Sequence, residues 1–219
     1  IHHKSSCYQQ STSKNLKITK AVTGSSYKLG NASFVIIAPN SPSYSNLNNY
    51  SVGVKFTNQN HSFVFTGDAE IESEKEMVQN GINLSADVLK LGHHGSTTSS
   101  HKDFLDAVSP SYAVITVGAG NSYGHPHKEI LDEMAKRNIS VFRTDEQGTI
   151  IFSSDGRTLN INQKPTTYQR SSSSSTKTNT TKETSSKETT TQKPVVDKET
   201  ITPPTENSDN SKSTLVYIT

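Results

Sequence analysis

The 219-residue chain is poor in cysteine, in aromatic residues and in apolar residues generally. Cys7 is the single cysteine, which excludes an internal disulfide framework and a cysteine-based zinc site. Tryptophan is missing, aromatic residues make up 7% and apolar residues 30% of the chain, whereas an ordinary globular chain is about 45–50% apolar with glycine counted. We therefore expect part of the chain to lie outside any folded domain.

Long apolar runs and a strong excess of either charge are also missing. No stretch approaches the ~20 apolar residues of a membrane span, so we expect no transmembrane segment. Residues 1–162 carry 14 Lys and Arg against 14 Asp and Glu, while residues 163–219 carry 8 against 6 and supply the whole net charge of +2. Because nucleic-acid binding usually needs a clustered basic face, this neutrality is a weak argument against DNA binding.

The C-terminal quarter has the composition of a linker. Between 171 and 200, 16 of 30 residues are Ser or Thr, with Lys and Glu interspersed. Such a segment cannot bury enough apolar surface to offset its ordering entropy, so we predict a disordered linker over 164–212. The apolar residues 213–219 predict either the start of a truncated further module or a frayed end. The Ser/Thr-rich tail fits an extracellular or cell-surface protein of a Gram-positive bacterium.

Residues 1–163 alternate between strand-like and helix-like segments. The hairpin-like order of 16–66, followed by alternating strands and helices, indicates an α/β fold in which helices cover one face of a sheet. In the third predicted helix, Ile130, Leu131 and Met134 form an apolar stripe. The predicted helices span 69–80, 100–108 and 127–138, and the predicted strands span 16–20, 33–38, 51–57, 62–66, 86–91, 112–117, 140–143, 149–152 and 158–161.

Two candidate site segments directly follow predicted strands. The first ends in Gly67-Asp68, where the carboxylate serves a site or caps the following helix. The second contains His93 and His94 between glycines, and imidazole is both a common metal ligand and a proton shuttle near pH 7. Adjacent residues of an extended segment point in opposite directions, so we expect one histidine to bind a metal and the other to contact substrate or a neighbouring ligand.

A third segment runs from Asn121 to His127. His125 precedes Pro126 and is therefore expected in an extended conformation before the helix, whereas His127 is expected in its first turn. His125 is the stronger candidate site residue, and the alternative is a turn that only starts the helix. One aspartate with several histidines at strand ends is the ligand set of a hydrolytic metal site, in which an aspartate can bridge two ions.

These segments together resemble the metallo-β-lactamase-fold domain of ComEC-type competence proteins, and soluble secreted hydrolases of that superfamily look similar. The resemblance extends over about 16–160, because the upstream residues 30–39 and 49–54 fit the same pattern. Its motifs are TGD at 66–68, KLGHHGST at 90–97, NSYGHP at 121–126, FRTD at 142–145 and Gly148.

The resemblance implies a four-layer αββα sandwich with two divalent metal ions, zinc or manganese, at one edge. Asp68 would bridge the ions and take part in catalysis. His94 is the favoured ligand of the second ion, with His93 as the other candidate ligand and otherwise a substrate contact, and His125 would line the pocket. The metals would activate a water molecule for attack on a phosphoryl or acyl centre.

One part of the expected pattern is missing from the sequence. The first metal motif of the superfamily, His-x-His-x-Asp-His, does not occur, and His2-His3 has no aspartate beside it. The chain is then either a fragment or a degraded relative, and the five retained motif segments favour the fragment. We therefore expect that it holds only the C-terminal half of the domain, that residues 1–163 leave an apolar sheet face uncovered, and that the chain alone is inactive and poorly soluble.

Three functions follow as expectations for the complete protein. The first is hydrolysis of phosphodiesters, with DNA as a substrate that the charge balance does not favour. The second is hydrolysis of small esters such as phosphocholine esters of the cell envelope. The third is a non-catalytic extracellular module that kept the fold without the metals.

Overall fold

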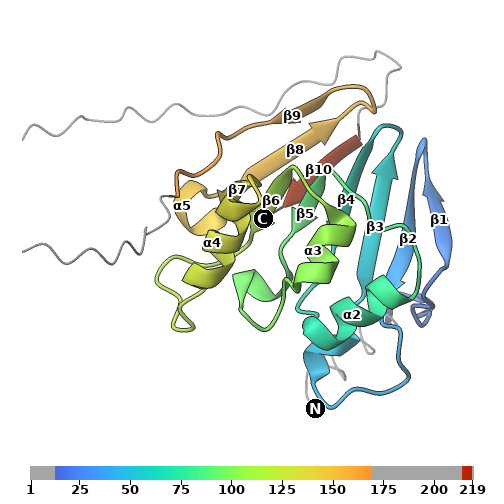
Figure 1. Ribbon diagram of the computed structural model, residues 1–219. Helices are drawn as coiled ribbons and strands as arrows, with labels where there is room; N and C mark the ends of the chain where they lie inside the picture. The colour runs from blue at the N-terminus through green and yellow to red at the C-terminus, as the bar shows by residue number, and fades with distance from the viewer. Residues whose placement is uncertain (1–12, 169–213, 219) are drawn as a thin grey trace, which may run out of the picture. The chain divides into compact units, whose positions relative to one another are not determined.

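The computed structural model describes residues 13–168 and the strand 214–218, and its centre is a seven-stranded mixed sheet (Figure 1). The strands are adjacent in chain order, from β1 to β7. β1 to β4 pair antiparallel and β4 to β7 pair parallel. The strands are β1 (Ser26–Leu29), β2 (Ala32–Ala38), β3 (Gly53–Asn58), β4 (His61–Phe65), β5 (Val88–Lys90), β6 (Tyr112–Ile115) and β7 (Ser140–Arg143).

Helices connect the parallel strands, as expected for parallel pairs, which need crossover connections. These helices are α2 (Ile71–Gln79), α3 (Lys102–Val108) and α4 (Lys128–Lys136). Shorter elements are the 3₁₀ helices η1 (Leu47–Tyr50) and η2 (Gly92–Gly95), and α5 (Thr144–Gln147). A second sheet of three strands has the order β10-β8-β9, with β8 at Ile150–Ser154, β9 at Leu159–Ile161 and β10 at Thr214–Ile218.

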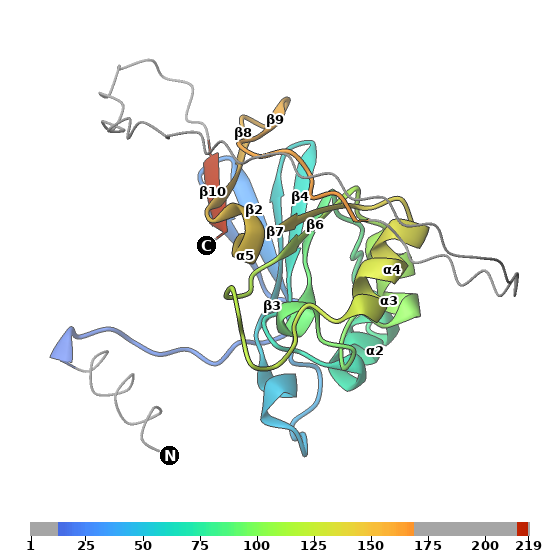
Figure 2. The same cartoon turned by 90° about the vertical axis from the view of Figure 1, so that its left-hand side faces the viewer.

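The core has two parts, one on each face of the large sheet. α2, α3 and α4 cover one face (Figure 2), where Met77, Phe104 and Met134 are buried against the strands. The other face is rich in phenylalanine, and Phe63 and Phe142 pack there against Phe152 of β8. The described residues therefore build a helical layer, the large sheet and the small sheet, which is an α/β fold.

The expected elements agree with this fold except at the N-terminal end. All three predicted helices are present within two residues of their expected limits, and eight of the nine predicted strands are present. The strand expected at 16–20 is wrong, because these residues have no partner strand and Leu16 and Ile18 are exposed. β1, which the sequence did not reveal, pairs with β2 instead.

The two expectations for the C-terminal part have different outcomes. Most of the predicted linker, 169–212, lies outside the described residues. A strand does form at 214–218, and it pairs antiparallel with β8 within the same compact unit as the preceding sheet. No helix in the described part of the chain is long and apolar enough to span a membrane.

Candidate functional site

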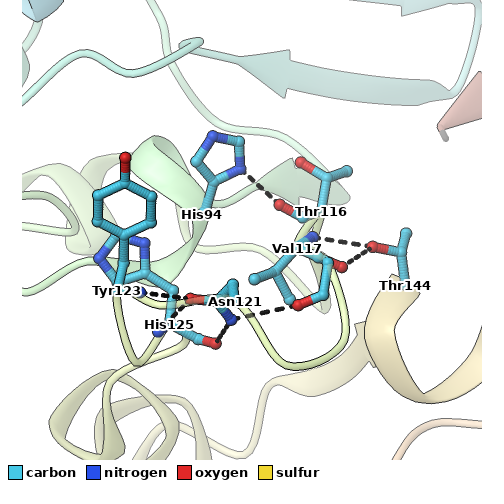
Figure 3. Close-up of a pocket in the computed structure, with 8 residues that line it drawn as sticks. His94, Thr116, Val117, Asn121, Tyr123, His125 and Thr144 are labelled. Atoms are coloured by element: carbon cyan, nitrogen blue, oxygen red, sulfur yellow. Dashed lines mark hydrogen bonds between the residues drawn. The ribbon is translucent and has the colours of Figure 1, made fainter.

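The candidate site lies at the edge of the large sheet where the parallel strands β4, β5 and β6 end. Ligands of open α/β sheets bind at this carboxyl edge. Asp68 follows β4, the twin histidines lie in η2 after β5, and the loop of residues 116–127 follows β6. The fold therefore brings together three segments that are far apart in the sequence, and Figure 3 shows the pocket between the last two.

Asp68 and His94 form one of two acidic–imidazole pairs at this edge, and the other is Glu70 with His93. His94 Nε2 lies 3.4 Å from Asp68 Oδ1, and both side chains are nearly half exposed. Asp68 is not the cap of the following helix, the alternative that the sequence left open, because the N-cap of α2 is Glu70. The backbone N–H of Asp68 donates to Ser51 Oγ at 3.1 Å, which ties the start of this segment to the loop before β3.

The opposite nitrogen of His94 fixes how this pair can act. Nδ1 lies 2.5 Å from the carbonyl oxygen of Thr116, which can only accept, so Nδ1 carries a proton. In the neutral ring, Nε2 then presents a lone pair to a carboxylate oxygen. Two acceptors at 3.4 Å are stable together only when a proton or a cation lies between them.

The pair has the spacing of two ligands on one metal ion. Two neighbouring corners of a tetrahedron with bonds of ~2.05 Å are about 3.3 Å apart, close to the observed separation. A histidine ligand that donates its other N–H to a backbone carbonyl is also typical of metal sites. However, no group of three or more His, Cys, Asp or Glu side chains is placed to hold a metal in the described part of the chain. Asp68 and His94 could hold a metal ion only together with further ligands.

His93 has hydrogen-bonding partners of its own. Its Nδ1 lies 3.3 Å from Glu70 Oε1 and 3.1 Å from Thr98 Oγ1, so a carboxylate and a hydroxyl hold the ring. Glu70 is itself held by the side-chain amides of Asn46 and Asn48. The expectation of an extended segment is wrong here, because His93 (φ 44°) and His94 (φ 55°) are both left-handed. The two rings lie 6.2 Å apart with their planes inclined by 65°, so they do not point in opposite directions as alternation along a strand would require.

Two consecutive left-handed residues other than glycine are strained, and such strain is concentrated at functional sites. Gly95 follows with φ +79°, and a Cβ atom there would lie 2.8 Å from Cβ of Pro126. The backbone N–H of His127 donates to the carbonyl of Gly95 at 3.0 Å. A glycine is therefore required where the twin-histidine turn meets the loop after β6.

That loop brings two more imidazoles to the site. The ring of His125 lies 5.6 Å from that of His93 and 6.5 Å from that of His94. Burial, followed by the charges of the neighbouring histidines, lowers the pKa of His125. His127 is the N-cap of α4 rather than a first-turn residue, and its Nδ1 accepts the N–H of Thr97 at 3.0 Å.

A pocket of about 480 Å³ opens beside His94 (Figure 3). Thr144 closes one wall, because its hydroxyl donates to the carbonyl of Val117 and accepts the N–H of the same residue, both at 2.8 Å. Tyr123 and His125 form the opposite wall, as the figure shows. The lining residues are His94, Thr116, Val117, Gly118, Asn121, Tyr123, His125 and Thr144.

Two charged groups near the site, one partly buried and one fully buried, are shifted by their surroundings. Burial lowers the pKa of Lys90, at the end of β5, and the negative charge of Asp68 opposes this shift. Glu74 of α2 is fully buried, and its carboxylate accepts the N–H groups of Ser100 and His101 at 2.8 and 2.7 Å. Burial raises the pKa of Glu74 to about 7. This carboxylate anchors the loop that follows the twin histidines.

The structure thus gathers Asp68, His93, His94 and His125 at one edge, and it adds residues that the sequence did not single out. Glu70 holds His93, and its place two residues after Asp68 was the available signal. Tyr123 lies within the NSYGHP motif, but its position on a pocket wall depends on the loop conformation. The Thr116 carbonyl that fixes His94 is a backbone group and leaves no trace in the sequence.

A comparison with known protein families matches none of them, but the chain is similar to several proteins named for competence or recombination. It is 34% identical to ComE operon protein 3 of Bacillus subtilis over 142 residues, and this aligned region covers 65% of the chain and 18% of that protein. It is 42% identical over 92 residues to competence protein ComA of Neisseria gonorrhoeae, covering 42% of the chain and 13% of that protein. It is 29% identical over 117 residues to recombination protein 2 of Haemophilus influenzae, covering 53% and 15%. The chain spans less than a fifth of the length of each of these relatives.

Proposed function

We propose that this chain acts in DNA uptake at the cell envelope, as a hydrolytic part of a ComEC-type competence protein. Three relatives whose names refer to competence or recombination support the role in DNA uptake. The Asp68–His94 pair, at the carboxyl edge of a parallel sheet, supports the hydrolytic part. The substrate on this proposal is a phosphodiester, and the fold is one part of a metallo-β-lactamase sandwich.

The single observation that carries the hydrolytic proposal is the position of His94 between Thr116 and Asp68. The Thr116 carbonyl holds the proton on Nδ1, so Nε2 is left to accept a proton from water or to bind a cation together with Asp68. A divalent cation bound there would lower the pKa of a water molecule and stabilise charge on the phosphoryl oxygens. Its remaining protein ligands would lie outside the described residues, since these provide two.

The other residues of the site have supporting roles on this proposal. His93, held by Glu70, presents its Nε2 to substrate rather than to the Asp68–His94 pair. His125 lines the pocket, where it can donate a hydrogen bond to a phosphate oxygen or a leaving group. The ammonium of Lys90 offsets the charge of Asp68 from the interior side.

The proposal is tested in the source organism by changing single residues at the chromosomal locus. We expect Asp68→Asn and His94→Gln to lower the release of acid-soluble nucleotides from labelled donor DNA and the frequency of transformation, each by at least tenfold. Asp103→Asn is the matched control. This carboxylate is exposed on α3, and its ion pair is with the nearby His101 rather than with a residue of the candidate site.

Two results separate the alternatives. Unchanged nucleotide release with reduced transformation would support a non-catalytic module that binds DNA or a partner. Normal transformation and normal nucleotide release in both variants would refute the proposed function altogether, and hydrolysis of a chromogenic phosphocholine ester would then become the next assay.

A further inference from the structure

Among the described residues, Tyr123 is the most exposed large apolar side chain, yet hydrogen bonds hold the loop that carries it. It is 78% exposed and lies on the wall of the pocket beside His94 (Figure 3). Its backbone N–H donates to Asn121 Oδ1 at 3.2 Å, and that of His125 donates to the same oxygen at 3.1 Å. The Asn121 amide nitrogen in turn donates to the carbonyls of His125 and Gly118 at 2.7 and 3.2 Å. One side chain therefore fixes the loop that presents this ring.

The ring of Tyr123 continues a row of nearly parallel rings that leads to the Asp68–His94 pair. Tyr123 and His125 have ring centroids 5.8 Å apart and planes inclined by 22°. His125 and His94 have centroids 6.5 Å apart and planes inclined by 24°. Tyr123 is the outer member, so a flat ligand that stacked on it would lie two rings away from the imidazole of the reactive pair.

The charges near the site do not favour a ligand held by its phosphates alone. Residues 1–162 have equal numbers of basic and acidic side chains. Arg143, close to the pocket wall at Thr144, is paired with Asp145 and Glu146, and Lys90 is offset by Asp68. Affinity for a DNA strand therefore needs a contribution that does not depend on positive charge. Stacking of bases on aromatic side chains provides one, and it tolerates any sequence.

We infer that Tyr123, backed by His125, is a stacking platform for a nucleobase of single-stranded DNA, which would hold the strand so that a phosphodiester further along it reaches Asp68 and His94. The inference rests on the proposed function and adds two points to it. The substrate is single-stranded, and the base is the part of the nucleotide that is recognised. A duplex, whose bases are already stacked on each other, would not use this platform.

The inference is tested by fluorescence anisotropy with the 219-residue chain and two labelled probes. One probe is a thymidine dodecamer, and the other has the same backbone with abasic sites in place of the bases. We expect the chain to prefer the base-bearing strand, and Tyr123→Ala to weaken its binding by about fivefold or more, the lower end for loss of one stacked base. Binding of the abasic strand should not change. Tyr123→Phe, which keeps the ring, should retain the preference.

Tyr27→Ala is the matched control, because this tyrosine is 43% exposed on β1 and stacks on Phe34 rather than lining the pocket. Circular dichroism checks that each variant is folded. An equal preference for the base-bearing strand in Tyr123→Ala and the wild type would overturn the inference, as would equal affinity of the wild type for both strands. If the wild type binds both strands equally, nucleotide release and transformation frequency still test the proposed function separately.

Discussion

Glu74 gives the sharpest prediction, because its carboxylate is fully buried and anchors the loop after the twin histidines. Each of its oxygens accepts one backbone N–H, from Ser100 and His101. Glu74→Gln preserves the shape but replaces one oxygen with an amide nitrogen, which cannot accept. One buried N–H is then left unsatisfied, at a cost of about 1–3 kcal/mol in the free energy of unfolding.

The pH dependence of this substitution follows from the raised pKa. Burial moves the pKa of Glu74 from 4.5 to about 7, so between these pH values the native state binds more protons than the unfolded state. The free energy of unfolding of the wild type therefore falls as pH rises through this window. The full shift corresponds to about 3 kcal/mol, at ~1.4 kcal/mol per pKa unit. Glutamine does not titrate, so the variant lacks this contribution.

Urea unfolding followed by circular dichroism between pH 4 and pH 8 tests both effects. We expect Glu74→Gln to be less stable than the wild type near pH 4. Towards pH 8 the free energy of unfolding of the wild type should fall by about 3 kcal/mol relative to that of the variant, which removes or reverses the difference. Glu129→Gln, on the exposed side of α4, should give a constant difference. Parallel curves for wild type and Glu74→Gln would refute the reasoning about this carboxylate.

Three further predictions concern the twin-histidine turn and the metal. Gly95→Ala should lower the free energy of unfolding by about 1–3 kcal/mol in urea titrations, because φ +79° and the 2.8 Å approach to Pro126 both oppose a Cβ atom; wild-type stability would contradict this. Isothermal titration calorimetry of the chain with Zn²⁺ should detect weak binding. Asp68→Asn and His94→Gln should each abolish this binding, and the control His101→Ala should leave it intact. Zn²⁺ binding by either Asp68→Asn or His94→Gln would show that these two donors do not hold the ion. His93→Ala should spare this Zn²⁺ binding but reduce nucleotide release, and the reverse pattern would exchange the roles of His93 and His94.

Much of the fold could be predicted from the sequence because its elements have strong local patterns. The apolar stripe of Ile130, Leu131 and Met134 predicts α4, whose buried residues are these three. β1 was missed because its four residues, SYKL, are all exposed and show no apolar face. Leu16 and Ile18 suggested a strand, but a strand needs a partner, and local composition does not supply one.

The site was predictable in its residues but not in its geometry. The strand ends before Asp68 and His93 placed both side chains at one sheet edge, and the structure brings Asp68 and His94 to 3.4 Å. The left-handed turn at His93 and His94 is accompanied by contacts with Glu70, Thr98 and Pro126, which are distant or non-adjacent in sequence. Tertiary contacts of this kind leave no periodicity to detect.

The central claim is that Asp68 and His94 act as one chemical unit. A double-mutant cycle measures this most directly, with release of acid-soluble nucleotides from labelled DNA in strains that carry Asp68→Asn, His94→Gln or both. Substitutions in groups that act as a unit have strongly non-additive effects. The double variant should therefore be about as active as the less active of the two single variants. Losses that multiply would show that the two side chains act independently and would contradict the account.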